Sequence, residues 1–353
     1  MASWYAGTAS GLFLIERASQ GKLAARPLDL QDAGGFRAPV VVDCADSRRL
    51  FAGTNRAGLF RSEDAGQSWH EINRGLVYKD VWALAQHPVT GTLYAGTSPA
   101  GVFRSDDRGE IWQACEALWQ LPSTRQWHGP IPPHISRLKD LALSEDEPGV
   151  VFGAIEEGWV VRSRDGGQTW EQIEQGVPHD SHWIRFVPGS DATLVLGGNA
   201  GMYRSTDGGG TWEGANRGLD GRAYTPSPIV TRLSRPGVLF SSVTAVGPGA
   251  WRRPEGGDAA FCRSTDGGLS WMTLTGGLPQ PLAPIPRALA ADPTNDQGYV
   301  AGLTDGSVWL TEDDGGTFRQ ALTGLPAVMS LAAAELNEAA LARQPRLHPP
   351  ALY

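Results

Sequence analysis

Short runs in which apolar and polar residues alternate recur along the chain. The runs GLFRS at 58–62, GVFRS at 101–105 and GMYRS at 201–205 are near copies, and related runs bring the total to seven. Each run follows an aromatic or aliphatic residue and several small ones, such as FAGT at 51–54 and YAGT at 94–97. A period of two is typical of β-strands with one buried face. Each repeat is therefore expected to hold two adjacent strands.

Two further strands complete each repeat. One is an upstream apolar stretch, found at 40–45, 81–88, 138–145, 183–188, 228–234 and 287–293. The other follows an aromatic residue, as in WHEI at 69–72, WEQI at 170–173 and WMTL at 271–274. Four antiparallel strands per repeat of roughly 43 to 60 residues are the blade of a β-propeller. Because one blade cannot bury both faces, the blades must stack around an axis and close.

The two ends of the chain predict how the ring closes. The first repeat, from Trp4, has no inner strand before it, whereas VMSLAAAE at 328–335 is an inner-type strand with no blade after it. We expect this C-terminal strand to complete the first blade. The prediction is an all-β, seven-bladed propeller over residues 1–336, followed by a tail at 337–353.

An acidic turn follows most of the alternating runs. Near copies of RSTDGGGTW begin at Arg61, Arg104, Arg162, Arg204 and Arg263, with a divergent copy at Leu310. The aspartate can accept hydrogen bonds from amides of a tight loop, the glycine can adopt a positive φ, and the tryptophan can pack between blades. The spacing fits neither a phosphate-binding loop nor a calcium-binding EF-hand loop. We interpret the turn as a structural element of the fold.

The pattern Ser/Thr-x-Asp-x-Gly-x-Ser/Thr-Trp resembles the Asp-box, or BNR repeat, of sialidases, sortilin-type receptors, xyloglucan-active glucanases and photosystem II assembly factors. Overall the chain looks most like soluble bacterial BNR-repeat proteins, a resemblance that implies the sialidase-like propeller fold and no particular chemistry. True sialidases open with an Arg-Ile/Leu-Pro motif, which this sequence lacks.

Composition narrows the range of partners and locations. The formal net charge of −8 and the absence of a Lys/Arg run argue against nucleic acid as a partner. No signal peptide and no apolar run of membrane-spanning length is recognisable, so no membrane association is expected. Three scattered cysteines indicate a reducing compartment. We expect a cytoplasmic monomer.

Two of the intervals between repeats are about 15 residues longer than the rest, and long loops on a rigid scaffold often carry function. The extra residues lie at 115–137, before the fourth inner strand, and at 243–260, between the second and third strands of the sixth blade. Both insertions are predicted to project from the face opposite the acidic turns.

A binding site is therefore predicted at this rim of the central channel. Its mixture of arginine and aromatic side chains suits a small polar or anionic ligand, or a protein partner. The candidate ligand-binding residues are Arg37, Arg56, Trp82, Trp127, His128, Arg137, His182, Tyr224, Trp251, Arg252 and Arg287.

Two chemical alternatives accompany the binding hypothesis. No cofactor is expected, but His134 and His182 lie in consecutive rim loops and are candidate ligands for a divalent metal. A glycoside hydrolase-like or metal-dependent enzyme could act in the same pocket, with Glu156 or Glu157 and Asp305 as the carboxylates. Whether the chain is an enzyme stays open at this point.

Overall fold

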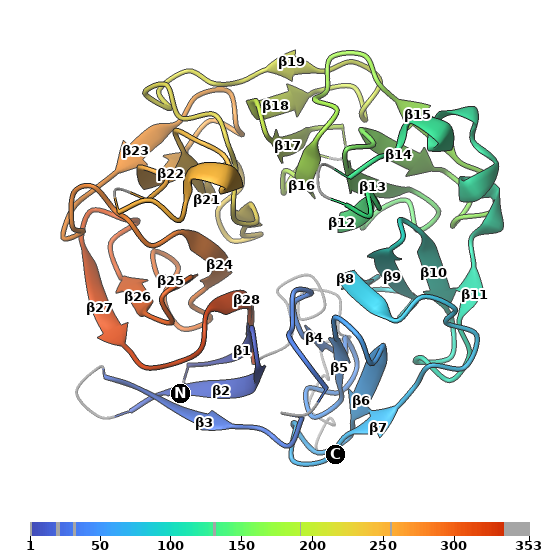
Figure 1. Ribbon diagram of the computed structural model, residues 1–353, viewed down its shortest axis with the longest axis horizontal. Coiled ribbons are helices and arrows are strands. Elements are labelled where there is room, and N and C mark those ends of the chain that lie inside the picture. The colour runs from blue at the N-terminus through green and yellow to red at the C-terminus, as the bar shows by residue number, and fades with distance from the viewer. Residues whose placement is uncertain are drawn as a thin grey trace, which may run out of the picture.

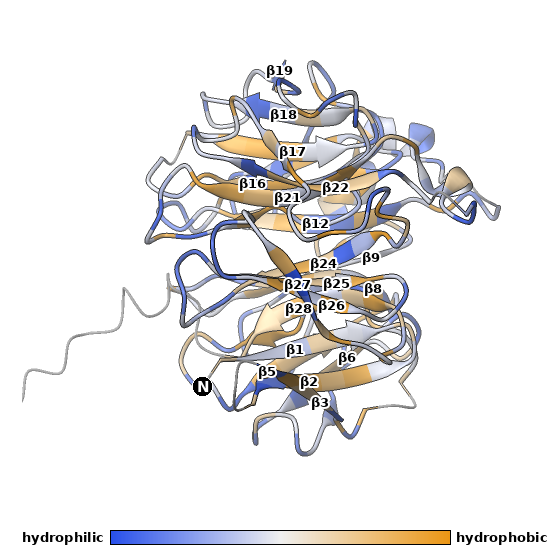
Figure 2. Cartoon of the chain, turned by 90° about the vertical axis from the view of Figure 1, so that its left-hand side faces the viewer, coloured by the Kyte–Doolittle hydropathy of each residue, from blue (hydrophilic) through white to orange (hydrophobic). Residues whose placement is uncertain are grey.

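Seven four-stranded antiparallel sheets stand around a common axis (Figure 1). The computed structural model describes residues 2–18, 22–30, 33–129, 132–190, 192–254 and 256–334. The expected all-β, seven-bladed propeller is confirmed. In the side view of Figure 2 the strands are predominantly hydrophobic and the connecting loops hydrophilic. The large apolar side chains therefore fill the layers between neighbouring blades.

The blades follow one another in chain order. Blade 1 consists of β28 (Val328–Ala333), β1 (Ser3–Thr8), β2 (Gly11–Arg17) and β3 (Leu23–Pro27). Blade 2 consists of β4 (Val41–Val42), β5 (Leu50–Gly53), β6 (Leu59–Ser62) and β7 (His70–Glu71), and blade 3 of β8 (Asp80–Gln86), β9 (Leu93–Ser98), β10 (Val102–Ser105) and β11 (Gln113–Ala114). In each blade the first strand named is the innermost.

The same order holds for the second half of the ring. Blade 4 consists of β12 (Arg137–Leu143), β13 (Val151–Glu156), β14 (Val160–Ser163) and β15 (Glu171–Ile173), and blade 5 of β16 (Ser181–Phe186), β17 (Leu194–Gly198), β18 (Gly201–Ser205) and β19 (Glu213–Gly214). Blade 6 consists of β20 (Val230–Thr231), β21 (Leu239–Thr244), β22 (Ala259–Ser264) and β23 (Met272–Leu274), and blade 7 of β24 (Pro286–Ala291), β25 (Tyr299–Leu303), β26 (Val308–Thr311) and β27 (Phe318–Leu322).

The ring closes through the two ends of the chain, as the sequence predicts. Strand β28 pairs antiparallel with β1, with Tyr5 opposite Ala332. The fully buried Trp4 donates a hydrogen bond from Nε1 to the carbonyl oxygen of Ala291 in blade 7, at 2.9 Å. The closing strand β28 therefore completes blade 1, and Trp4 of β1 links that blade to blade 7. The proposed tail at 337–353 lies outside the described residues.

The acidic turns are held by a repeated set of hydrogen bonds. In blade 5, Asp207 accepts hydrogen bonds from the amide of Thr211 at 2.9 Å and from its hydroxyl at 2.8 Å. These bonds hold the pKa of the Asp207 carboxyl at about 2. Gly209 has φ +80, and its amide donates to Ser205 Oγ at 2.9 Å. The turn therefore satisfies its own polar groups without a ligand.

An arginine at the start of each of five turns reaches across to the turn of the next blade. Arg204 donates from Nε to the carbonyl oxygen of Gly267 at 2.9 Å, and Arg162 donates from Nη1 to that of Gly208 at 2.7 Å. Corresponding bonds run from Arg61 to Arg108, from Arg104 to Gly166 and from Arg263 to Asp314. The turns thus link consecutive blades, a role that their sequence pattern alone does not reveal.

Connectivity places the two insertions on the same side of the ring. The acidic turns join the third and fourth strands of a blade, whereas the first insertion joins β11 to β12 and the second joins β21 to β22. Because successive strands alternate in direction, both of these connections emerge opposite the turns. The first contains η2 (Glu116–Gln120) and η3 (Pro122–Gln126), and the second contains η4 (Pro248–Ala250). Among the described residues, no helix is long and apolar enough to cross a membrane.

Candidate functional site

Five of the innermost strands carry a β-bulge at the same level. In β12, for example, Leu138 pairs with Ile155 and Asp140 with Ala154, which leaves Lys139 as the extra residue. A bulge interrupts the regular alternation of side chains and can aim the extra one in a new direction. The extra residues in the five strands are Trp82, Lys139, His182, Arg287 and Met329.

These bulges build the lining of a small pocket on the channel axis, here called the channel pocket. Six residues from six blades or their entry loops line it: Arg37, Trp82, Lys139, Trp183, Arg287 and Met329. Four of the six are bulged residues. The bulges therefore convert a set of sheet edges into a ring of inward-directed side chains.

Cationic side chains are concentrated around the channel pocket. The guanidinium carbons of Arg37 and Arg137 lie 4.4 and 4.6 Å from the ring centroid of Trp82. Both are within the range of a cation–π interaction. The ammonium of Lys139 lies 5.9 Å from the ring centroid of Trp183, and the side chain of Lys139 is 6% exposed. The walls of the pocket are thus aromatic and positively charged.

One carboxylate neutralises part of this charge. Glu156, at the end of β13, lies 2.5 Å from Arg137 Nη1 and 3.3 Å from Lys139 Nζ. Burial by itself would raise the pKa of Glu156, but the positive charges of Lys139 and Arg137 outweigh it and hold that pKa at about 2. Burial lowers the pKa of Lys139, and Glu156 opposes that effect. Glu156 is therefore ionised throughout the neutral range.

Two arginines of the pocket have no such partner. Among the described residues, neither Arg37 nor Arg287 makes a hydrogen bond or an ion pair, and each instead faces an aromatic ring. Burial lowers the pKa of Arg37, and the positive charges of Arg287 and Arg137 lower it further. Burial also lowers the pKa of Arg287. The two guanidinium groups are thus partly desolvated and mutually repulsive.

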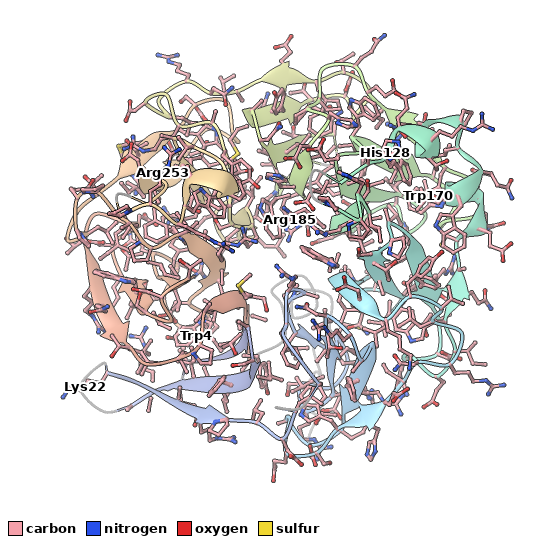
Figure 3. The ribbon with its side chains drawn as sticks, in the orientation of Figure 1. Trp4, Lys22, His128, Trp170, Arg185 and Arg253 are labelled. Carbon is pink, nitrogen blue, oxygen red and sulfur yellow. The ribbon has the colours of Figure 1, made fainter. Side chains whose placement is uncertain are left out.

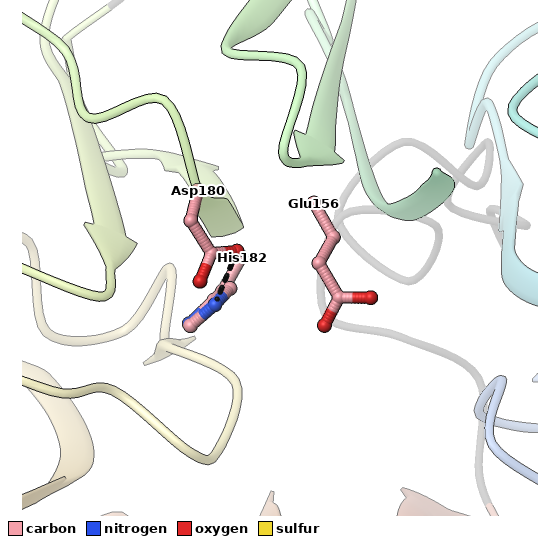
Figure 4. A group of neighbouring side chains, drawn as sticks. All are labelled: Glu156, Asp180 and His182. Carbon is pink, nitrogen blue, oxygen red and sulfur yellow. Dashed lines mark hydrogen bonds and ion pairs between the residues drawn. The ribbon is translucent and has the colours of Figure 1, made fainter. Parts of the chain in front are cut away.

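Beside the cations lies a buried group of Glu156, Asp180 and His182 (Figure 4). Each residue offers one potential ligand atom, and the three atoms lie within 4.8 Å of one another. His182 is completely buried, with Nε2 2.9 Å from Asp180 Oδ1 and Nδ1 3.1 Å from the carbonyl oxygen of Thr225. The hydroxyl of Thr225 also lies 3.4 Å from Nδ1, so a neutral ring can donate from Nε2 to Asp180 and accept at Nδ1. Burial and the charge of Lys139 lower the pKa of His182, which favours this neutral form.

Aromatic rings connect this group to the second insertion. The ring centroid of Tyr224 lies 4.7 Å from that of His182 and 5.3 Å from that of Trp251. The guanidinium carbon of Arg287 lies 5.4 Å from the ring of Trp251. The structure therefore brings together seven of the candidate residues predicted from the sequence: Arg37, Trp82, Arg137, His182, Tyr224, Trp251 and Arg287.

The other candidate residues do not reach the channel pocket. Trp127 is buried and donates from Nε1 to Gln172 Oε1 of the outer strand β15 at 3.2 Å. His128 lies well away from the axis in Figure 3 and pairs through its backbone with Ile135. Arg56 and Arg252 are exposed. His134 places Nδ1 2.9 Å from the carbonyl oxygen of Gly129, so it is not part of the group around His182.

Several residues of the site escaped the sequence-based prediction. Lys139, Trp183 and Met329 line the channel pocket, and Asp180 contacts His182. A lysine within the apolar inner strand of LKDLALSE was the available signal, because charged side chains are rarely buried without a partner. Nothing in the sequence marks Met329 as different from the other apolar residues of its strand.

A larger pocket of about 570 Å³ occupies the other mouth of the channel. Segments from all seven blades line it, and none of the predicted site residues does. Its buried carboxylate, Asp140, accepts hydrogen bonds from Arg185 and from the amide of Ile184. Because Asp140 and Arg185 neutralise each other, we place the candidate site at the smaller, cationic channel pocket.

Comparisons with known proteins show the fold. No protein-family model and no curated protein matches the chain. The GH74 xyloglucanase from Xanthomonas campestris is similar with a TM-score of 0.65 and 18% identity, over 94% of this chain and 52% of that one. A putative 6-phosphogluconolactonase from Bacteroides fragilis has a TM-score of 0.62 and 11% identity, over 94% and 97% of the two chains.

A third solved structure is YCF48 bound to a D1 peptide, with a TM-score of 0.57 and 17% identity over 88% of this chain and 89% of that one. This chain covers 45%, 52% and 37% of the length of three GH74 enzymes that it resembles. All of these proteins share the β-propeller architecture with this chain.

Proposed function

We propose that this chain is an Asp-box propeller that binds a small anionic ligand at the cationic rim of the channel, next to the channel pocket, whose own volume is about 10 Å³. The observation that carries the proposal is the pair Arg37 and Arg287, which have no hydrogen-bond or ion-pair partner among the described residues. Burying a charged group without a counterion is costly unless something compensates for the lost hydration. An anion between the two guanidinium groups supplies that compensation.

The surroundings support the same proposal. Guanidinium groups bind carboxylates and phosphates through paired, charge-assisted hydrogen bonds. The apolar walls formed by Trp82, Trp183 and Met329 limit access of water, which strengthens such bonds. The bulge of β24 holds Arg287 on a strand rather than on a loop, so this group is preorganised, whereas Arg37 lies in the loop before β4.

Calorimetric titration with small carboxylates and phosphates tests the proposal. We expect Arg37→Gln and Arg287→Gln each to weaken binding by about 10- to 100-fold, since each removes a charged hydrogen-bond donor. Arg164→Gln is the matched control, because Arg164 is 59% exposed on the face of the acidic turns. Unchanged affinities in both pocket variants would eliminate the anion site.

A divalent metal is the second candidate, and the group of Glu156, Asp180 and His182 favours it. A cation at His182 Nε2 would take the place of the proton that the His182–Asp180 contact otherwise needs. Against this, Arg137 and Lys139 already engage both oxygens of Glu156. Elemental analysis of the purified protein, with His182→Gln as control, decides between a bound metal and a metal-free ion-pair network.

A glycoside hydrolase in this pocket would need a carboxylic acid that holds its proton near neutral pH. The charges of Lys139 and Arg137 hold the pKa of Glu156 well below its usual range, which disfavours Glu156 in that role. Burial raises the pKa of Glu157, which lies 2.9 Å from His179 Nδ1. Turnover of chromogenic glycosides that disappears in Glu157→Gln would support the enzymatic alternative. Capture of a protein by the same face would support a binding partner instead.

A further inference from the structure

We infer that the larger pocket is a second binding site, and that its ligand is an uncharged, hydroxyl-rich molecule such as a cyclic polyol. Its volume of about 570 Å³ lies within the range of roughly 300–1,000 Å³ that is typical of small-molecule sites. The inference does not depend on the anion site, because the two sites differ in position and in charge.

The larger pocket lies where the inner strands end. Gln86, Phe186 and Ala291 are the last residues of β8, β16 and β24, and all three line it. Since successive strands alternate in direction, the inner strands end on the same face as the acidic turns. On the opposite side, Lys139 lines the channel pocket of about 10 Å³, and the next residue, Asp140, already lines the larger one. The pocket is therefore a concave site whose wide mouth opens on the face of the acidic turns.

The walls combine apolar side chains with backbone polar groups. Apolar side chains from six blades line the pocket: Val42, Leu84, Leu143, Phe186, Leu233 and Ala291. The innermost strand of each blade is paired on one side only, so N–H and C=O groups of its other edge face the channel. Alternating donors and acceptors beside apolar surface match a molecule whose hydroxyl groups both donate and accept and whose C–H faces are apolar.

Arg185 provides fixed hydrogen-bond donors inside the pocket. It lies beside the central opening of the ring in Figure 3. Its Nη1 donates to Asp140 and, at 2.6 Å, to the carbonyl oxygen of Ile184. Among the described residues, the N–H groups on Nε and Nη2 of Arg185 make no hydrogen bond, and the side chain is 28% exposed. These N–H groups can therefore donate to an oxygen atom of a ligand.

The charges of the lining disfavour a charged ligand. Five charged side chains line the pocket: Asp140, Glu145, Asp146, Arg185 and Arg232. Arg185 is paired with Asp140, and Arg232 donates from Nη2 to the carbonyl oxygens of Asp292 and Gly298 at 2.7 and 2.8 Å. Glu145 and Asp146 lie in the loop after β12 and are at least partly exposed. A charged ligand would thus lose hydration in the pocket without gaining an unpaired counterion there.

Three sugars with the same ring and different charges test the inference. At about pH 6 glucose is uncharged, glucuronate carries one negative charge and glucosamine one positive charge. Titration of the full chain, followed by saturation-transfer NMR, is expected to show that glucose binds about tenfold tighter or more than either charged sugar. Galactose and myo-inositol repeat the measurement with two further uncharged polyols.

Variants locate the binding site. Arg185→Lys keeps a positive charge beside Asp140 but loses the planar fork of donors, and it is expected to weaken binding of the tightest polyol about fivefold or more. Asp146→Trp places a large ring at the mouth and is expected to weaken binding as well, which covers the case in which Arg185→Lys does not fold. Glu147→Trp is the matched control, because Glu147 is the next residue and is exposed but is not part of the lining.

The outcomes separate this inference from the proposed function. Failure of glucose, galactose and myo-inositol to bind would overturn the inference and leave the anion site standing, since that site lies at the opposite mouth of the channel. Tighter binding of glucuronate or glucosamine than of glucose would overturn it too. Affinities that stay unchanged in both Arg185→Lys and Asp146→Trp would place the polyol elsewhere and contradict the inference.

Discussion

At the scale of single residues, Glu156 organises the cations of the site. It is largely buried and holds Arg137 and Lys139, so its loss would leave two cationic groups in a poorly hydrated place. Removing one partner of a buried ion pair costs more stability than the intact pair contributes, because the remaining charge is left buried and uncompensated. The same residue that prepares the pocket therefore also contributes to the stability of blade 4.

Replacing Glu156 by glutamine is expected to lower the free energy of unfolding by about 3–5 kcal/mol. Glu171→Gln is the matched control, because Glu171 also pairs with two arginines, Arg162 and Arg164, but its side chain is 51% exposed. The control should change stability by about 1 kcal/mol or less. Denaturant unfolding measures both, and equal effects would show that burial of Glu156 is energetically unimportant.

The low pKa of Glu156 also predicts a pH dependence. Its pKa is about 2 in the folded protein against an ordinary value of 4.5, so the folded state binds this proton more weakly than the unfolded state does. The stabilisation is therefore fully present above pH 5 and is lost as the pH falls from about 4.5 to about 2. We expect the difference in stability between the parent and Glu156→Gln to shrink over this range. A constant difference from pH 6 down to pH 3 would contradict the assignment.

At the scale of elements, the acidic turn and the β-bulge have different roles: the turn links neighbouring blades, and the bulge directs a side chain into the channel. The turn is a self-contained loop whose arginine binds the next blade, as Arg204 does through Gly267. The bulge acts at the inner strand and selects the side chain that enters the channel, as it does for Lys139. The turns thus connect the blades of the ring, and the bulges supply side chains that line the channel pocket.

Gly209 tests the turn. Its φ of +80 disfavours any side chain, and an added Cβ would lie 2.7 Å from Cε1 of Phe152 in the preceding blade. Gly209→Ala is expected to destabilise the protein by more than about 1 kcal/mol. Gly214→Ala is the control, since no atom lies within 4 Å of a Cβ there. Thermal unfolding compares the two, and equal midpoints would refute the role of the turn glycine.

At the scale of the whole molecule, β28 gives the ring its closure and the channel one of its walls. It pairs with β1, packs its Leu331 with the cluster shared by blades 1 and 7, and places Met329 in the channel pocket. The pairing of the two ends of the described chain, β1 and β28, therefore contributes both to the stability of the ring and to the lining of the channel pocket. A propeller lacking this strand exposes the edge of β1 and the face of blade 7.

Ending the chain at Ala327 is accordingly expected to lower the melting temperature of the entire ring in one cooperative transition. A chain that ends at Ala334 keeps all of β28 and serves as the reference. The same truncation at Ala327 should weaken anion binding, because it removes Met329 from the pocket. Equal melting temperatures of the two chains, measured by calorimetry, would show that closure does not depend on this strand.

The sequence by itself determined the number of blades, the order of strands, the turn and the closing strand, because these follow from periodicities within each repeat. Alignment of the repeats also predicted that Arg137 and Arg287 lie at the start of inner strands, as they do in β12 and β24. Only the tertiary structure decided that Lys139 and Met329 enter the channel, because a bulge adds one residue that alternation does not count. Only the packing of blade 4 against blade 5 brings Glu156, Asp180 and His182 together. Only the tertiary structure shows that Arg37 and Arg287 make no ion pair among the described residues, since charge balance in a channel depends on residues that are far apart in the chain.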